Sequence, residues 1–186
     1  FFTGGIGILA PAELETLLKT AVEITGEKIW LSVGAIPKLL LEKYLPYIKG
    51  VVGSTETINP ELHKKVCPSK PLQPYERMFE AAKELNLEKA MTFIVGLGEV
   101  KEDLVLLKEF ITKYNITKIH VYSLIPHEGT TYENASIPTK EDQAWWISQL
   151  RIAFPKLDIQ CGIWEDRLEN IPLLLQAGAN SISKFK

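Results

Sequence analysis

The sequence has few cysteines and no large excess of either charge, and both shortages restrict what the protein can bind. Its 186 residues include two cysteines, Cys67 and Cys161, which form no CxxC pair and no metal-ligand spacing. These thiols alone predict no metal site. A net charge of -2, with acidic and basic residues interspersed, gives no field that would attract nucleic acid or an anionic membrane surface. We interpret the basic cluster of Lys64, Lys65 and Lys70 as a solvated helix end.

Long apolar runs are also lacking. No segment is apolar enough to cross a bilayer and no charged-then-apolar leader is present, so we expect a cytoplasmic protein without nucleic-acid or membrane partners. A hydrophobic share of 46%, with no repeat or linker, predicts one domain over residues 1–186 with a substantial core. The sequence begins at Phe1, without methionine and directly on an apolar strand, which we interpret as the N-terminal truncation of a longer protein.

Short apolar runs alternate along the chain with longer amphipathic patterns. This order is typical of βα units and a parallel sheet. It predicts an α/β fold, a partial TIM-like (β/α) barrel with helices outside and the first βα unit missing; a doubly wound open sheet is the alternative. The seven predicted strands are Phe1–Phe2, Ile29–Val33, Gly50–Gly53, Ala90–Val95, Lys118–Leu124, Leu157–Cys161 and Asn180–Ser183.

Several helix boundaries are marked by residues with special backbone properties. Pro11 suits the first turn of a helix that Gly26 ends. Thr139, three residues before Asp142, is a capping signal for another helix. Gly178 suits the left-handed position after the last helix.

Three tryptophans lie near predicted helix and strand ends. Trp145 and Trp146 are adjacent on one helix, so we expect one in the core and the other on a surface. Trp164 follows a strand, where core packing is the preferred interpretation and a place in a substrate cavity the alternative.

Glycines and charged residues follow the predicted strands. In a parallel α/β barrel, the carboxyl ends of the strands form the face on which ligands bind. Gly4 and Gly5 would let a ligand approach the backbone closely, and Glu56 would place a carboxylate at the barrel mouth. Arg77 could pair with a ligand carboxylate in bidentate fashion.

Two further loops lie at strand ends. The turn from Gly96 to Glu99 has two glycines but lacks the third glycine and the ribose-binding acid of the dinucleotide fingerprint. Leu124-Ile125-Pro126 begins a loop whose direction Pro126 fixes. His127 at its tip is more readily explained as a solvated residue than as a catalytic one.

Each strand-end group also has a purely structural explanation. The glycine pair can be no more than a tight turn. A helix cap at Thr57 or Asn59 would leave Glu56 exposed, and Arg77 can instead form a surface salt bridge. The residues by themselves assign no catalytic group.

Taken in order and spacing, these groups resemble the radical S-adenosylmethionine superfamily, and more narrowly its biotin synthase-like branch. The resemblance runs from Thr3 to Ser183. Its most specific parts are Phe93 to Glu99, similar to the family's GxIxGxGE element, and Ser123 to Thr130, similar to its NxLxPxxGTP element. Weaker matches are Glu56-Thr57 with Tyr75-Glu76-Arg77, similar to ETxxExY…YxxR, and Gly178-Ala179-Asn180, similar to GAN.

The resemblance implies a partial barrel that binds S-adenosylmethionine across its mouth beside a 4Fe-4S cluster. In that family a 5′-deoxyadenosyl radical is released and abstracts a hydrogen from the substrate. The implied cofactor-binding residues are Gly4 and Gly5 for the methionyl ammonium, Glu56 for the ammonium or ribose, Arg77 for the carboxylate, Ile94 and Gly96 for the adenine, with Leu124 and Pro126 beside them.

Three departures from the family pattern shape the expected reaction. The cluster motif CxxxCxxC is absent and expected upstream of Phe1, so we expect this sequence alone to be inactive. Ile6 replaces the acid usual after the paired glycines. Trp30 and Ala90 stand where biotin synthase has cysteines for an auxiliary cluster, so we do not expect biotin synthase itself.

The resemblance also implies partners. They are a small-molecule or lipoyl-type substrate, an electron-donor protein and a second enzyme component. Lipoyl synthesis, as in the two-component lipoyl synthases of archaea, is the preferred reaction. The hydrogenase-maturation, methylornithine-forming and thiazole-pathway enzymes are the alternatives. Two other functions stay open. One is a non-redox barrel that binds a nucleotide or phosphate, and the other is a degenerate scaffold, which Ile6 favours.

Overall fold

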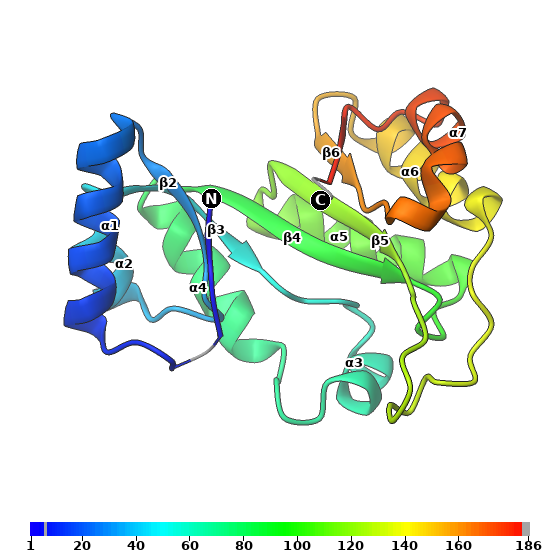
Figure 1. The fold of residues 1–186 in the computed structure, drawn as a ribbon, viewed down its shortest axis with the longest axis horizontal. Coiled ribbons are helices and arrows are strands. Elements are labelled where there is room, and N and C mark those ends of the chain that lie inside the picture. The colour runs from blue at the N-terminus through cyan, green and yellow to red at the C-terminus, as the bar shows by residue number, and fades with distance from the viewer. Residues whose placement is uncertain (6, 184–186) are drawn as a thin grey trace.

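The computed structural model describes residues 1–5 and 7–183. Its strands form one parallel sheet in the sequential order β1-β2-β3-β4-β5-β6-β7. The sheet curls into a half-barrel with the helices outside (Figure 1). The strands are β1 (Phe2–Thr3), β2 (Ile29–Ser32), β3 (Ile48–Gly53), β4 (Glu88–Val95), β5 (Lys118–Ser123), β6 (Asp158–Cys161) and β7 (Ser181–Ile182).

Helices connect successive strands on the outer face. They are α1 (Pro11–Thr25), α2 (Lys38–Tyr44), α3 (Pro60–Val66), α4 (Gln73–Glu84), α5 (Leu104–Tyr114), α6 (Lys140–Ala153) and α7 (Ile171–Gln176), with 3-10 turns η1 (Lys101–Asp103) and η2 (Glu165–Asn170). A doubly wound sheet would carry helices on both faces and reverse its strand order. The partial barrel prediction is therefore confirmed, and the open-sheet alternative is wrong.

The helix boundaries follow the local signals. Pro11 opens α1, and Gly26 follows it in the left-handed conformation, with φ of 72°. Thr139 caps α6, because its hydroxyl accepts the Asp142 amide and the Asp142 carboxylate accepts the Thr139 amide. No helix among residues 1–5 and 7–183 is long and apolar enough to cross a membrane.

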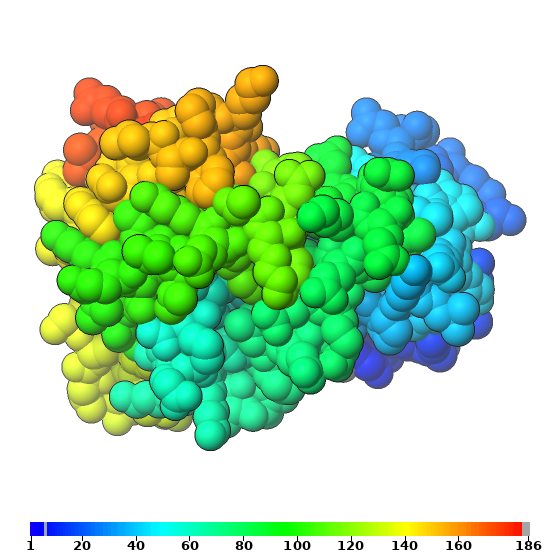
Figure 2. Space-filling model, turned by 180° about the vertical axis from the view of Figure 1, so that it is seen from behind, coloured from blue at the N-terminus to red at the C-terminus, as the bar shows by residue number. Residues whose placement is uncertain are grey.

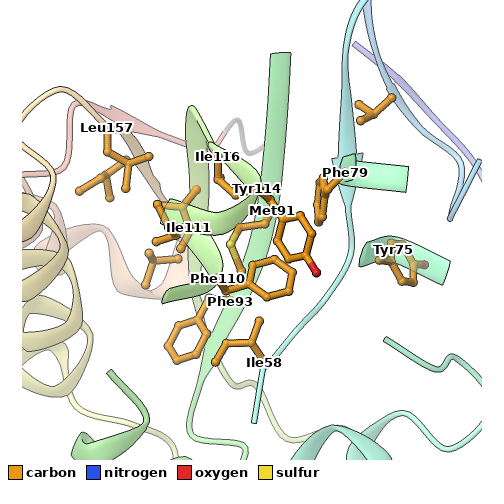
Figure 3. Close-up of a cluster of buried hydrophobic side chains, with 14 of the residues drawn as sticks. Ile58, Tyr75, Phe79, Met91, Phe93, Phe110, Ile111, Tyr114, Ile116 and Leu157 are labelled. Atoms are coloured by element: carbon orange, nitrogen blue, oxygen red, sulfur yellow. The ribbon is translucent and has the colours of Figure 1, made fainter. Parts of the chain in front are cut away.

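The core lies between the sheet and the outer helices. Aromatic residues of α4 and α5 pack there against β4, with the Phe79 and Phe110 rings edge to face at 5.9 Å (Figure 3). Seen from behind, side chains from the middle of the chain form the centre of this side (Figure 2). Fully burying each large apolar side chain stabilises the fold by about 1.5–3 kcal/mol.

The tryptophans divide between core and surface. Trp146 packs in the core while Trp145 is half-buried, and their rings meet edge to face at 5.1 Å. Trp164 is 52% exposed, so the expectation that it packs in the core is wrong. It precedes η2, a run whose described side chains include none that is buried.

Side chains on the strands alternate between the two faces of the sheet. On β4, Met91, Phe93 and Val95 point to the helices and belong to the core, which leaves Ala90, Thr92 and Ile94 on the inner face. Trp30 of β2 lies over Gly50 on this inner face, where a Cβ at Gly50 would lie 2.6 Å from the indole ring. The indole of Trp30 therefore covers Gly50 on the inner face.

Candidate functional site

An ion pair lies at the carboxyl end of β3. The Lys70 ammonium is 2.7 Å from Oε1 of Glu56, and the side chains are 24% and 21% exposed, respectively. Glu56 adopts the left-handed backbone conformation, with φ of 59°, which is costly for a residue other than glycine and is concentrated at functional sites. The structure thus holds a partly buried carboxylate and ammonium together at the end of the barrel where the strands terminate.

Hydrogen bonds to β4 fix the position of Glu56. Thr92 Oγ1 donates to Glu56 Oε2 at 3.0 Å and accepts the Glu56 amide at 3.3 Å. The Ile94 amide donates to the Glu56 carbonyl at 2.8 Å, and Thr55 Oγ1 donates to the Thr92 carbonyl at 2.7 Å. The segment after β3 is therefore bonded to β4, and these hydrogen bonds fix the orientation of the Glu56 carboxylate.

The charge of Lys70 is maintained by its partner. Burial lowers the pKa of Lys70, but the hydrogen bond and the attraction of the Glu56 carboxylate outweigh burial and raise the pKa above its ordinary value. The Lys70 ammonium therefore stays charged near neutral pH.

Buried polar groups surround this pair. His63 of α3 and Tyr75 of α4 are buried, and neither His63 Nε2 nor the Tyr75 hydroxyl has a hydrogen-bond partner among the described residues. Burial and the nearby Lys70 charge lower the pKa of His63, and burial raises the pKa of Tyr75. Burial also raises the pKa of Cys67.

The loop after β3 contains both a helix cap, at Asn59, and the paired carboxylate of Glu56. Asn59 caps α3, since its side chain accepts the amides of Glu61 and Leu62. Capping at Asn59 was predicted as the alternative to a Glu56 site, with Glu56 exposed. The structure shows the cap and a half-buried, paired Glu56 together, so one does not exclude the other.

The structure does not bring Arg77 to Glu56. Arg77 lies on the exposed face of α4, and no hydrogen bond or ion pair joins it to another described residue. The cation beside the Glu56 carboxylate is Lys70. Interpreting Lys70 as part of a solvated helix end was wrong, because its pairing with a residue 14 positions earlier depends on the path of the loop.

The glycine pair lies in a different place. Gly4 and Gly5 line an apolar pocket of about 220 Å³ beside Ile8, Leu14 and Val33. The Gly4 amide donates to the Ser32 carbonyl at 3.0 Å, so Gly4 extends the pairing of β1 with β2. Ile6 lies outside the described residues.

The loops after β4 and β5 pack against each other. The Leu124 amide donates to the Val95 carbonyl at 2.8 Å, and Leu124 is buried while Pro126 is half-buried. Gly96 has φ of 100°, and a Cβ there would lie 2.3 Å from Pro138 Cγ. Packing therefore accounts for this glycine. Gly96 also lines a pocket of about 680 Å³ with Lys101, Thr139 and Trp145.

The eight predicted cofactor-binding residues thus fall into three places and not one. Glu56 and Ile94 are joined directly, and Gly96, Leu124 and Pro126 lie on the adjoining strand-end loops. Gly4 and Gly5 form a separate apolar pocket, and Arg77 faces away. His127 is exposed, as its interpretation as a solvated residue requires.

A metal centre is not formed by the described residues, because no group of three or more histidine, cysteine or acidic side chains converges there. Cys161 is buried in the core on the helix side of β6, and Cys67 is half-buried after α3. These two thiols do not fit an iron–sulfur cluster, which needs several thiolates at one place.

No protein-family model matches the chain. It is 36% identical over 185 residues to an uncharacterized protein of Methanocaldococcus jannaschii, covering 100% of this chain and 51% of the relative. It is 26% identical over 170 residues to the 7,8-didemethyl-8-hydroxy-5-deazariboflavin synthase of Archaeoglobus fulgidus, covering 88% and 52%. The chain therefore spans about half the length of these curated relatives.

Solved structures of low sequence identity have the same fold. Methylornithine synthase superposes with a TM-score of 0.83 at 23% identity, over 92% of this chain and 51% of the enzyme. The FeFe-hydrogenase maturase HydG of Carboxydothermus hydrogenoformans gives 0.78 at 16%, over 94% and 44%. A domain of the pyruvate-formate lyase-activating enzyme of Bacteroides vulgatus gives 0.61 at 14%, over 86% and 99%. The chain therefore shares its fold with these three proteins.

Proposed function

We propose that this chain forms the S-adenosylmethionine-binding half-barrel of a radical S-adenosylmethionine enzyme. The observation that carries the proposal is the Glu56–Lys70 pair, held at the carboxyl end of β3 by Thr92 and Ile94. The fold shared with methylornithine synthase and HydG supports it.

The pair is chemically complementary to the methionyl end of S-adenosylmethionine. That end carries an ammonium and a carboxylate on one carbon, so it needs one anion and one cation side by side. We assign the ammonium to Glu56 and the carboxylate to Lys70, whose exposed fractions of 21% and 24% leave part of each accessible. His63 Nε2 and the Tyr75 hydroxyl offer further hydrogen-bonding capacity beside Lys70. Arg77 has no part in this assignment.

The remaining predicted contacts are proposed for the other parts of the molecule. Ile94 and Gly96 would meet the adenine through their backbones, with Leu124 and Pro126 from the next loop beside them. Contact of Gly4 and Gly5 with the methionyl ammonium stays a prediction, since both residues line the separate apolar pocket and the Gly4 amide is bonded to Ser32.

The proposed chemistry of the whole protein is that of the superfamily: reductive cleavage of the sulfonium, then abstraction of a substrate hydrogen by the 5′-deoxyadenosyl radical. The described residues do not supply the thiolates of a 4Fe-4S cluster. We propose that these cysteine ligands lie elsewhere in a protein of the relatives' length. An electron-donor protein would reduce the cluster that they hold. A cytoplasmic location is part of the proposal.

The proposed branch is biotin synthase-like in fold. Biotin synthase itself does not fit, because Trp30 and Ala90 stand where it has cysteines for an auxiliary cluster. Trp30 lies over Gly50 and Ala90 is fully buried on the inner face, and neither side chain can ligate iron. Sulfur insertion of the lipoyl synthase type would need sulfur from a second component, since Cys161 faces the helices. We therefore propose hydrogen abstraction from a small molecule as the shared step.

The test is production of 5′-deoxyadenosine. The protein, at the length of its relatives, is reconstituted with iron and sulfide without oxygen and given dithionite and S-adenosylmethionine. We expect 5′-deoxyadenosine from the wild type and at least about tenfold less from Glu56→Gln or Lys70→Gln, which corresponds to about 1.4 kcal/mol. Lys64→Gln, an exposed lysine six residues from Lys70, is the matched control.

Absence of both 5′-deoxyadenosine and S-adenosylmethionine binding would overturn the proposal. The non-redox barrel that binds a nucleotide or phosphate would then become the preferred function. The HMG-CoA lyase of Brucella melitensis also shares the fold, with a TM-score of 0.62 at 12% identity.

A further inference from the structure

Four polar side chains form a row across the inner face of the half-barrel. Thr92 pairs in register with His120, His120 with Gln160, and Gln160 with Ser181. Residues paired in this way on parallel strands share a face. Their neighbours Phe93, Ile119 and Ile159 point to the helices, so the row Thr92–His120–Gln160–Ser181, the inner row, faces the barrel interior.

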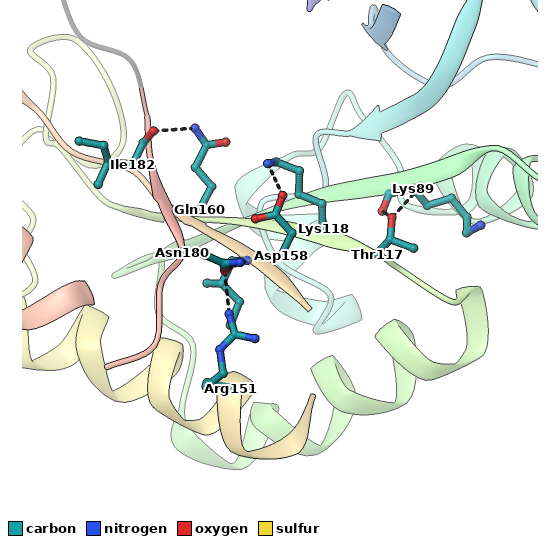
Figure 4. Close-up of polar contacts among 9 residues, drawn as sticks. Lys89, Thr117, Lys118, Arg151, Asp158, Gln160, Asn180 and Ile182 are labelled. Carbon is teal, nitrogen blue, oxygen red and sulfur yellow. Dashed lines mark hydrogen bonds and ion pairs between the residues drawn. The ribbon is translucent and has the colours of Figure 1, made fainter. Parts of the chain in front are cut away.

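The inner row contains unused hydrogen-bonding capacity. Thr92 is bonded to Glu56, and Gln160 Nε2 donates to the Ile182 carbonyl at 3.1 Å (Figure 4). His120 Nε2 and Ser181 Oγ are buried and have no hydrogen-bond partner among the described residues, and His120 as a whole is only 5% exposed. Buried polar atoms are nearly always paired, so two orphans on one face require an explanation.

The row carries no free charge. Lys118 and Asp158, one inward-facing position earlier on β5 and β6, bind each other at 2.6 Å (Figure 4). Burial, and to a smaller extent the Lys118 charge, lower the pKa of His120 to about 4 against the opposing effect of Asp158. Its imidazole is therefore neutral near pH 7 and offers one donor and one acceptor.

Aromatic rings border the row. The Tyr122 ring meets His120 edge to face at 6.3 Å, and the Phe1 ring lies 6.5 Å from His120, although β1 and β5 are four strands apart in the sheet. Because the sheet is curled, the aromatic ring of Phe1 lies close to the inner row. Such an arrangement suits a planar group with polar atoms at its edge.

We propose that His120, Gln160 and Ser181 bind the neutral amide, lactam or hydroxyl edge of a planar substrate, and that carboxylates and phosphates are not accepted there. Identification of this ligand as the substrate rests on the proposed function. Thr92 links the two sites, since it is bonded to Glu56 and is the strand neighbour of His120. A ligand on the inner row would therefore lie beside the mouth where the radical is proposed to form.

Fragment binding tests the row without requiring any cofactor. Benzamide and its anionic counterpart benzoate are titrated into the protein, and the side-chain signals of His120 and Gln160 are followed by NMR. We expect benzamide to shift both signals, with a dissociation constant on the order of 1–10 mM for so small a ligand. We expect benzoate to shift them at least about tenfold more weakly.

Variants decide whether the row is responsible. His120→Phe keeps a ring of similar size and should abolish the benzamide response, and Ser181→Ala gives a second test if His120→Phe does not fold. His127→Phe, in an exposed loop, is the matched control and should bind like the wild type. No benzamide response, an equal benzoate response, or a response that survives both row variants would overturn the inference.

The two proposals fail separately. Formation of 5′-deoxyadenosine without benzamide binding would overturn only the assignment of the inner row. Benzamide binding that depends on His120, in a protein that neither forms 5′-deoxyadenosine nor binds S-adenosylmethionine, would leave the inner row as a ligand site and overturn the radical function.

Discussion

Thr92 Oγ1 on β4 donates a 3.0 Å hydrogen bond to Glu56 Oε2, which follows β3. This hydroxyl joins the Glu56–Lys70 pair to the inner row, because Thr92 is also the register partner of His120. One side chain therefore orients the proposed cofactor anchor and begins the proposed substrate site.

Removing that hydroxyl should affect both stability and binding. In Thr92→Val, Glu56 loses a charge-assisted hydrogen bond, so we expect a loss of roughly 1.5–3 kcal/mol in the free energy of unfolding. S-adenosylmethionine affinity should fall about tenfold, measured by calorimetric titration. Thr92→Ser keeps the hydroxyl and loses one methyl group, which costs about 0.8 kcal/mol. Equal affinity in the two variants would contradict the role of the hydroxyl.

Replacing Lys70 should lower S-adenosylmethionine affinity, whereas replacing Arg77 should leave it unchanged. Lys70→Gln removes the partner of Glu56, so S-adenosylmethionine affinity should fall at least about tenfold, or 1.4 kcal/mol. Arg77→Gln changes an exposed residue and should alter stability by no more than about 0.5 kcal/mol, with unchanged affinity. Calorimetric titration of both variants checks this. A large effect of Arg77→Gln with none for Lys70→Gln would restore the original assignment of Arg77.

Gly96 and Gly129 provide a matched pair for packing. A side chain at Gly96 would meet Pro138 at 2.3 Å and strain a φ of 100°, so Gly96→Ala should cost roughly 2–4 kcal/mol. Gly129 has φ of 77° but open space around it, so Gly129→Ala should cost only about 1 kcal/mol. Urea unfolding measures both. Similar losses would show that conformation, and not Pro138, decides the cost at Gly96.

His120 should make the protein sensitive to mild acid. Its pKa is about 4 in the folded state against 6.5 when unfolded, so the unfolded state binds the proton first. The contribution of His120 to the free energy of unfolding is fully present above pH 6.5 and is lost as the pH falls towards 4. The difference between the folded and unfolded pKa corresponds to about 3 kcal/mol.

Comparison with a variant isolates this histidine from the carboxylates that titrate in the same range. Between pH 7 and pH 4, the free energy of unfolding of the wild type should fall by about 3 kcal/mol more than that of His120→Phe. Urea unfolding across this range is the measurement. Parallel pH profiles would mean that His120 keeps an ordinary pKa in the folded protein.

The sequence determined the secondary structure and its order. Pro11, Gly26 and Thr139 mark helix ends because their effects act within one turn, and apolar runs of strand length recur between helical patterns. Parallel strands joined by helices then leave few possible arrangements. The half-barrel could be predicted for this reason, without any knowledge of which residues meet.

The tertiary structure decided which side chains form a site. Lys70 reaches Glu56 through the path of a loop, Arg77 faces solvent because of the helix phase of α4, and Trp164 stays exposed beside η2. His120 gave no signal in the sequence, since its burial and its neighbours come from strands distant along the chain. Partners of a side chain depend on face, register and curvature, which only the assembled sheet specifies.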